Sequence, residues 1–111
     1  MANQTGIDGG IEVTFEFSRH LGPRYVHGSV TLQFSSHLPY TFESTAVWPV
    51  SDNYEVAVQE SVEEVLLAYL GDLSKTHVLL KRINWDEVSS CEAGFRQAAR
   101  AATKAAFEIC Y

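Results

Sequence analysis

The spacing of apolar residues changes along the chain, and this change limits the possible folds more than any other feature. Apolar and polar residues alternate from residue 11 to 17, again from 25 to 34, and a third time from 40 to 48. Alternation with a period of two is typical of strands that bury one face. The Gly-Pro pair between the first two segments and the short stretch at residues 35–39 predict turns, so we expect an antiparallel meander of three strands.

The alternation also assigns the two faces of this predicted sheet. The set expected to face the core is Ile11, Val13, Phe15, Phe17, Val26, Gly28, Val30, Leu32, Phe34, Phe42, Ser44, Ala46 and Trp48. The set expected to face water includes Glu12, Thr14, Glu16, His27, Ser29, Thr31, Gln33 and Glu43. One face is therefore polar, and any helices must cover the other.

Helical periodicity begins after the third strand. Val58, Val62, Val65, Leu66 and Tyr69 recur at spacings of three and four residues, and Gly71 follows as a helix stop. A fourth strand is predicted at residues 78–83, and an alanine-rich helix from about Ser90 to Ile109. The fold class is α+β: a two-layer βββαβα sandwich, with a four-stranded sheet and two helices on one face.

Two short motifs resemble helix starts. Asp52 precedes Glu55 by three residues, and Ser89 precedes Glu92 by the same distance, which predicts a capping box at each helix. Val88 is expected to close the second start as a hydrophobic staple with Ala93.

Length and composition indicate one domain. Residues 1–10 are small, polar and glycine-rich, which predicts a flexible tail before a single domain at residues 11–111. The start lacks the pattern of a signal peptide, so a cytoplasmic location is expected. Cys91 and Cys110 lie roughly 28 Å apart on one continuous helix, which is too far for a disulfide between them.

The net charge of −6 argues against general nucleic-acid binding, but the charge is unevenly distributed. Residues 1–74 carry ten acidic and two basic residues, whereas residues 75–111 carry four acidic and six basic ones. Separate acidic and basic surfaces are therefore expected on one domain.

The segment from Trp85 to Phe95, which reads Trp-Asp-Glu-Val-Ser-Ser-Cys-Glu-Ala-Gly-Phe before an alanine-rich helix, resembles domain IV of translation elongation factor G. That family has an aromatic-His-Asp-Val-Asp-Ser-Ser-Glu-x-Ala-Phe run there. Tyr54–Val58 is similar to the family's Glu-Tyr-x-Pro-Ala-Val helix start, and Gly28–Phe34 to its Gly-x-Val-x-Ile strand. The resemblance covers roughly residues 22–108 and implies the fold of ribosomal protein S5 domain 2.

The resemblance also implies where a partner binds. In the elongation factor, the loops at the domain tip enter the ribosome, so residues 20–25 and 84–88 are the expected contact loops. The family's tip residues differ here: its His falls on Asp86, its Gln on Val26, and its Gly-Gly pair on Val47 and Trp48. The chain contains no G-x-x-x-x-G-K-[ST] sequence and therefore no GTPase motif of that kind.

Several residues are candidates for a site. The partner-binding hypothesis names Arg24, Tyr25, Trp85, Asp86, Arg96, Arg100 and Lys104. The last three recur every four residues, and the alternative to phosphate binding is pairing with Glu60, Glu63 or Glu64 on the other helix, or simple exposure to solvent. For Trp85, the alternative to an interface anchor is core packing.

Catalytic candidates have simpler interpretations. Cys91 at a helix N-terminus would need His27 or His77 as a base, and the alternative is a small residue at the family's Ser position. Asp86 and Glu87 are adjacent carboxylates, whose alternative role is to favour the following helix. The four histidines lack ligand spacing, so no metal, cofactor or small-molecule substrate is expected.

The sequence therefore predicts a non-catalytic binding module. The resemblance implies the ribosome or ribosomal RNA as partner, and a protein partner or a homo-oligomer is the alternative. No membrane contact is expected. A small enzyme that uses Cys91 is the competing class.

Overall fold

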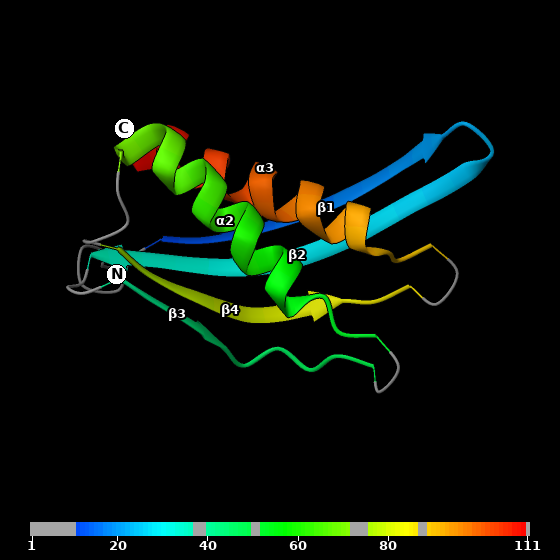
Figure 1. Cartoon of the computed structure of the whole chain (residues 1–111), viewed down its shortest axis with the longest axis horizontal. Coiled ribbons are helices and arrows are strands. Elements are labelled where there is room, and N and C mark those ends of the chain that lie inside the picture. Colours follow the sequence, from blue (N-terminus) through cyan, green and yellow to red (C-terminus); the bar gives the residue numbers. More distant parts are fainter. Residues whose placement is uncertain (1–10, 37–39, 50–51, 72–75, 87–88, 111) are drawn as a thin grey trace.

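The computed structural model describes residues 11–36, 40–49, 52–71, 76–86 and 89–110, and the predicted tail lies outside these ranges. Figure 1 shows a sheet with both helices on one face. The elements in chain order are β1 (Ile11–Leu21), β2 (Arg24–Ser36), β3 (Thr41–Ser44), α2 (Glu55–Leu70), β4 (Thr76–Asn84) and α3 (Glu92–Cys110). The α+β two-layer sandwich predicted from the sequence is confirmed.

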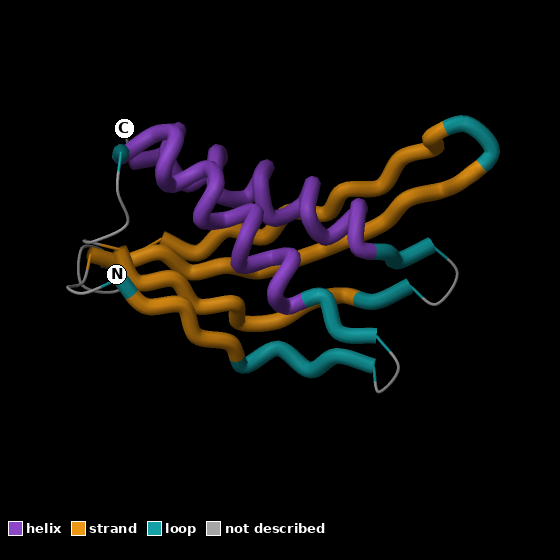
Figure 2. The backbone as a smooth tube through the Cα atoms, viewed as in Figure 1, coloured by secondary structure: helices purple, strands orange, loops and turns teal. Residues whose placement is uncertain are grey.

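The sheet is mixed, and the predicted three-stranded meander is wrong. Its strand order is β1-β2-β4-β3: β2 is antiparallel to both its neighbours, whereas β3 pairs with β4 in parallel. Helix α2 returns the chain along the sheet, and β4 then enters between β2 and β3 (Figure 2). Alternation within a strand does not specify its neighbour, which is why the sequence indicated the strand but not its place.

A bulge in β4 lies beside the end of β3. Thr31 pairs with Arg82 but Leu32 pairs with Leu80, so Lys81 is the extra residue. The bulge shifts the alternation, and Val78, Leu80 and Ile83 all reach the core. The predicted third strand ended at Trp48, but pairing stops at Ser44, next to the bulge.

The core lies between the sheet and the helices. Its fully buried members include Leu32, Leu80, Val58, Val62 and Phe95. Alanines along α3, at positions 98, 99, 102 and 106, are buried and allow close packing.

Helix α3 and strand β2 meet backbone to backbone at two glycines. A Cβ on Gly28 would lie 2.3 Å from the backbone carbon of Gly94, and one on Gly94 would lie 2.1 Å from the carbonyl oxygen of His27. The sequence placed Gly28 in the inward set but did not indicate this contact.

Neither predicted capping box forms. Helix α2 begins at Glu55, whose backbone N–H donates to the side-chain oxygen of Asn53 at 2.9 Å. Asn53 therefore accepts the hydrogen bond that was expected of Asp52. Helix α3 begins at Glu92, and the hydroxyl of Ser89 is buried without a hydrogen-bond partner. The predicted staple at Val88 lies outside the described residues. The predicted stop at Gly71 is confirmed, with φ at 82°.

Candidate functional site: the loop end of the domain

The hairpin formed by β1 and β2 extends beyond the rest of the sheet (Figure 1). Their register is continuous from Ile11↔Phe34 to Leu21↔Arg24, whereas β4 leaves β2 at Ser29. The strands are joined by two residues, and Gly22 takes a φ of 66°, as the first central position of a type II′ turn requires. A tight turn and a full ladder make this hairpin a well-defined projection.

A buried histidine fixes the base of the hairpin. The ring of His27 hydrogen-bonds to Glu16 at 2.8 Å through Nε2 and to Ser90 at 2.9 Å through Nδ1. The Ser90 hydroxyl also accepts the backbone N–H of Asp86 at 2.8 Å. The main chain repeats this connection: the N–H of His27 donates to the carbonyl of Ser89, and the N–H of Cys91 donates to the carbonyl of His27. The segment before α3 is thereby fastened to the hairpin.

The sequence did not predict this network. His27, Ser29 and Thr31 were expected to face water, but each is at most 6% exposed. They lie on a central strand, and side chains of β1 and β4 flank them: Thr31 contacts the hydroxyl of Thr14 at 2.9 Å, for example. The sequence did contain one signal of this burial: these polar residues lie on a strand that has a neighbouring strand on each side.

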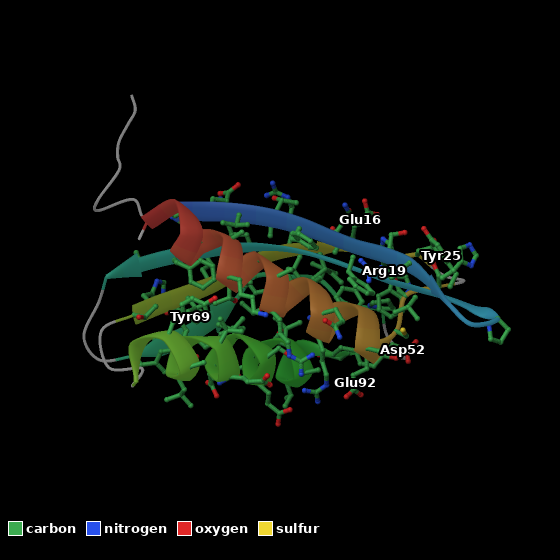
Figure 3. The ribbon with its side chains drawn as sticks, turned by 90° about the horizontal axis from the view of Figure 1, so that it is seen from above. Glu16, Arg19, Tyr25, Asp52, Tyr69 and Glu92 are labelled. Carbon is green, nitrogen blue, oxygen red and sulfur yellow. The ribbon has the colours of Figure 1, made fainter. Side chains whose placement is uncertain are left out.

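The tip of the hairpin carries exposed polar and aromatic side chains. Tyr25 is 41% exposed, its ring lies 4.7 Å edge-on from that of His20, and its hydroxyl contacts Ser18. The guanidinium of Arg19 lies 5.3 Å from the centre of the Phe17 ring. Figure 3 shows Arg19 and Tyr25 together at this end of the molecule. The side chain of Arg24, also predicted for the site, lies outside the described residues.

Four aromatic rings support the loops beside the hairpin. Trp85 stacks on Phe95 with centroids 5.6 Å apart, and Trp48 and Tyr54 complete the cluster. The indole N–H of Trp48 donates to Glu55 at 3.2 Å. Partial burial, reinforced by Asp52, raises the pKa of Tyr54. Trp85 is therefore packed against the core, which agrees with the alternative that the sequence left open.

The three basic residues of α3 follow the helix along α2 rather than gathering at the loop end. Arg96 pairs with Glu60 at 3.0 Å and Glu92 at 2.9 Å, and Arg100 pairs with Glu64 at 3.4 Å. The hydrogen bonds from Glu92 and Glu60 raise the pKa of Arg96. Lys104 is exposed, and no described side chain forms an ion pair with it.

The catalytic candidates are only partly brought together. The backbone of Cys91 contacts His27, but both ring nitrogens of His27 already bond to Ser90 and Glu16. His77 lies beside Ser35 and Glu43. Asp86 joins the loop end through Ser90, and Glu87 lies outside the described residues. Within the described ranges, no group of three His, Cys, Asp or Glu side chains could hold a metal ion.

Helices capable of crossing a membrane are also absent from the described part of the chain.

Elsewhere in the molecule, the hydroxyl of Tyr40 donates to Glu63 and so connects the start of β3 to α2. Burial and this hydrogen bond raise the pKa of Tyr40.

Comparison with known proteins identifies the fold alone. No family model matches the chain, and no curated protein matches it. A crystal structure of a protein from Thermus thermophilus is similar, with a TM-score of 0.74 and 22% sequence identity. The match covers 85% of this chain and 15% of that one, so there the fold is one part of a longer protein. At this identity the likeness establishes a shared architecture.

Proposed function

We propose that the chain is a non-catalytic binding module whose β1–β2 hairpin tip contacts ribosomal RNA. The observation that carries the proposal is the charge of the tip. Arg19 and Arg24 are the two basic residues of the first 74 positions, and both lie in the hairpin. No acidic residue occurs from Phe17 to Gly28. A basic projection on a protein with a net charge of −6 suits a phosphate partner.

The side chains at the tip suit single-stranded or looped RNA. An exposed tyrosine can stack on a base, and arginine can bind phosphate with two hydrogen bonds. Because His27 fixes the hairpin base, the tip would lose little conformational entropy on binding. The resemblance of residues 22–108 to elongation factor G domain IV favours the ribosome among RNA partners.

The other predicted contacts take lesser roles in this proposal. Arg96 and Arg100 are engaged by glutamates of α2, so a phosphate would have to displace a carboxylate. Trp85 supports the loop end from within the aromatic cluster. The tip therefore makes the contact, and the cluster positions it.

Co-sedimentation with ribosomes at low and moderate salt tests the proposal. We expect binding that weakens with salt and is lost in a variant carrying Arg24→Glu and Tyr25→Ala. Lys104→Glu is the matched control, because it makes the same change of charge on an exposed position of α3. Absence of binding at both salt concentrations would contradict the proposal and direct the search to protein partners. Equal loss in the control would mean that overall charge or the basic stripe of α3, not the tip, determines binding.

A further inference from the structure

Among the described residues, strand β1 forms a long outer edge of the sheet without the bulge or proline that often protects such edges. The strand has 11 residues, pairs with β2 without a bulge, and contains no proline or glycine. The opposite edge strand, β3, has four residues. Edge strands normally carry bulges, prolines or unpaired charges that prevent pairing with another chain.

The backbone groups that face outward can be assigned from the turn. The two-residue turn closes with a hydrogen-bonded pair, Leu21 and Arg24, and hydrogen-bonded and non-bonded pairs then alternate along the ladder. Odd-numbered residues of β1 therefore bond to β2. The N–H and C=O groups of Glu12, Thr14, Glu16 and Ser18 point away from the sheet.

Both carboxylates on this edge have side-chain partners within the chain. Glu12 pairs with Lys81 at 2.7 Å and with Arg82 at 3.8 Å, and Glu16 bonds to His27 at 2.8 Å. Each carboxylate is thus held by side chains of its own chain, although two carboxylates placed directly opposite each other would still repel. On the helix side, Ile11, Phe15 and Phe17 are only partly buried, so an apolar row lies along the same edge.

We propose that β1 pairs with β1 of a second copy of this chain, antiparallel and centred on Phe15, to form a continuous eight-stranded sheet. In this register Thr14 of each copy faces Glu16 of the other, and Glu12 faces Ser18. Val13 faces Phe17, and the two Phe15 rings meet, so the apolar row is covered. About eight backbone hydrogen bonds form.

Charge selects this register among its neighbours. If the pairing is centred on Thr14 instead of Phe15, Glu12 of each copy lies opposite Glu16 of the other. If the pairing is centred on Glu16, the two Glu16 side chains lie opposite each other. Like charges directly opposite destabilise a pair of strands, so both alternatives are disfavoured.

The arrangement of the helices allows this pairing. Figure 3 shows β1 along the outer border of the sheet and α3 inside it, with its C-terminal end nearest the beginning of β1. In an antiparallel dimer, that end of each α3 lies opposite the hairpin end of the partner's β1. The two turns at residues 22–23 point in opposite directions and lie beyond the paired segment, although Arg19 of each copy comes to lie opposite Ile11 of the other. Dimer formation does not require the proposed RNA contact.

Sedimentation velocity over a wide concentration range tests the dimer. We expect a monomer–dimer equilibrium that Thr14→Lys tightens and Thr14→Glu weakens, each by about tenfold, because residue 14 meets Glu16 of the other copy twice by symmetry. Both variants lose the same Thr31 contact and therefore control for each other.

A third variant, Thr14→Pro, removes an outward N–H and should abolish the dimer while circular dichroism stays that of the native fold. If this proline unfolds the chain, the lysine and glutamate pair still decides. A monomer at every concentration would overturn the proposal. So would a dimer that both charge variants leave unchanged or shift in the same direction.

Discussion

The two faces of the sheet are stabilised in different ways. The helix-covered face depends on shape: Gly28 meets Gly94 with no room for a methyl group, and alanines line α3. The open face depends on partnership: Glu12 binds Lys81, Glu16 binds His27, and Glu43 binds His77. Shape tolerates almost no substitution at the contact, whereas a partnership between exposed groups is worth little. Substitutions on the two faces should therefore differ greatly in cost.

Gly94→Ala should have the largest effect, above about 4 kcal/mol of unfolding free energy, because the new methyl would overlap the His27 carbonyl and α3 would have to move. Chemical denaturation measures the loss, and the variant is expected to be largely unfolded.

Gly71→Ala is its matched control. It makes the same chemical change where nothing lies within 4 Å, and only the φ of 82° is unfavourable. That variant should lose about 1–2 kcal/mol. Similar losses at both positions would show that the close approach of α3 and β2 contributes nothing of its own.

Phe95→Ala should follow, with a loss of about 3–5 kcal/mol. The ring is fully buried and contacts Trp48, Tyr54 and Trp85, so its removal leaves a cavity under the loop end. Near-ultraviolet circular dichroism should lose tryptophan signal along with the stability. A stable variant with an unchanged signal would contradict the role assigned to the cluster.

His27→Ala tests the open face where it is buried, and should cost about 1.5–3 kcal/mol because a charged hydrogen bond is lost and Ser90 loses a partner. Amide hydrogen exchange should also accelerate in the projecting part of the hairpin, residues 17–28, because the variant loses the side-chain contacts that fix the base of the hairpin.

Glu16→Gln is the comparison for His27→Ala, because the amide oxygen can still accept from the ring. It should keep most of the protection. If both variants exchange alike, the charge of Glu16, rather than the position of His27, holds the hairpin.

The same contrast explains what the sequence could predict. The secondary-structure elements follow from local sequence patterns. The alternation in β1 and β2, the helical spacing of α2 and the stop at Gly71 all predicted elements that the structure contains. Partnership depends on which strands become neighbours. The parallel pairing of β3 with β4 and the bulge at Lys81 come from tertiary packing, and no local pattern encodes them.

Only part of the candidate site was predicted, because its long-range contacts depend on which segments become neighbours in the fold. The loops at residues 20–25 and 84–88 were expected at the tip because of the family resemblance. The His27 network between them joins residues 63 positions apart in sequence, Ser90 and His27, and only the folded chain brings these together. The pairing of Arg96 and Arg100 with α2 was left open, because helix periodicity gives the face of each charge but not its neighbour.

Glu12→Gln should have the smallest effect and gives the sharpest test of partnership. The hydrogen bond and charge of Lys81 hold the pKa of Glu12 below its ordinary value of 4.5, so the folded chain favours the carboxylate. Its contribution to stability is present above about pH 4.5 and is lost as the pH falls through the lowered folded-state pKa. The side chain is 42% exposed, so solvent limits the loss to below about 1 kcal/mol.

Denaturation of both proteins near neutral pH and near pH 3 measures this dependence. The difference between wild type and Glu12→Gln should be present at neutral pH and shrink as the pH falls through the lowered pKa of wild-type Glu12, because the wild-type side chain then loses its charge too. If the difference keeps its size in acid, the charge of Glu12 is not its source. The ion pair with Lys81 would then matter for what the β1 edge can pair with rather than for the stability of the monomer.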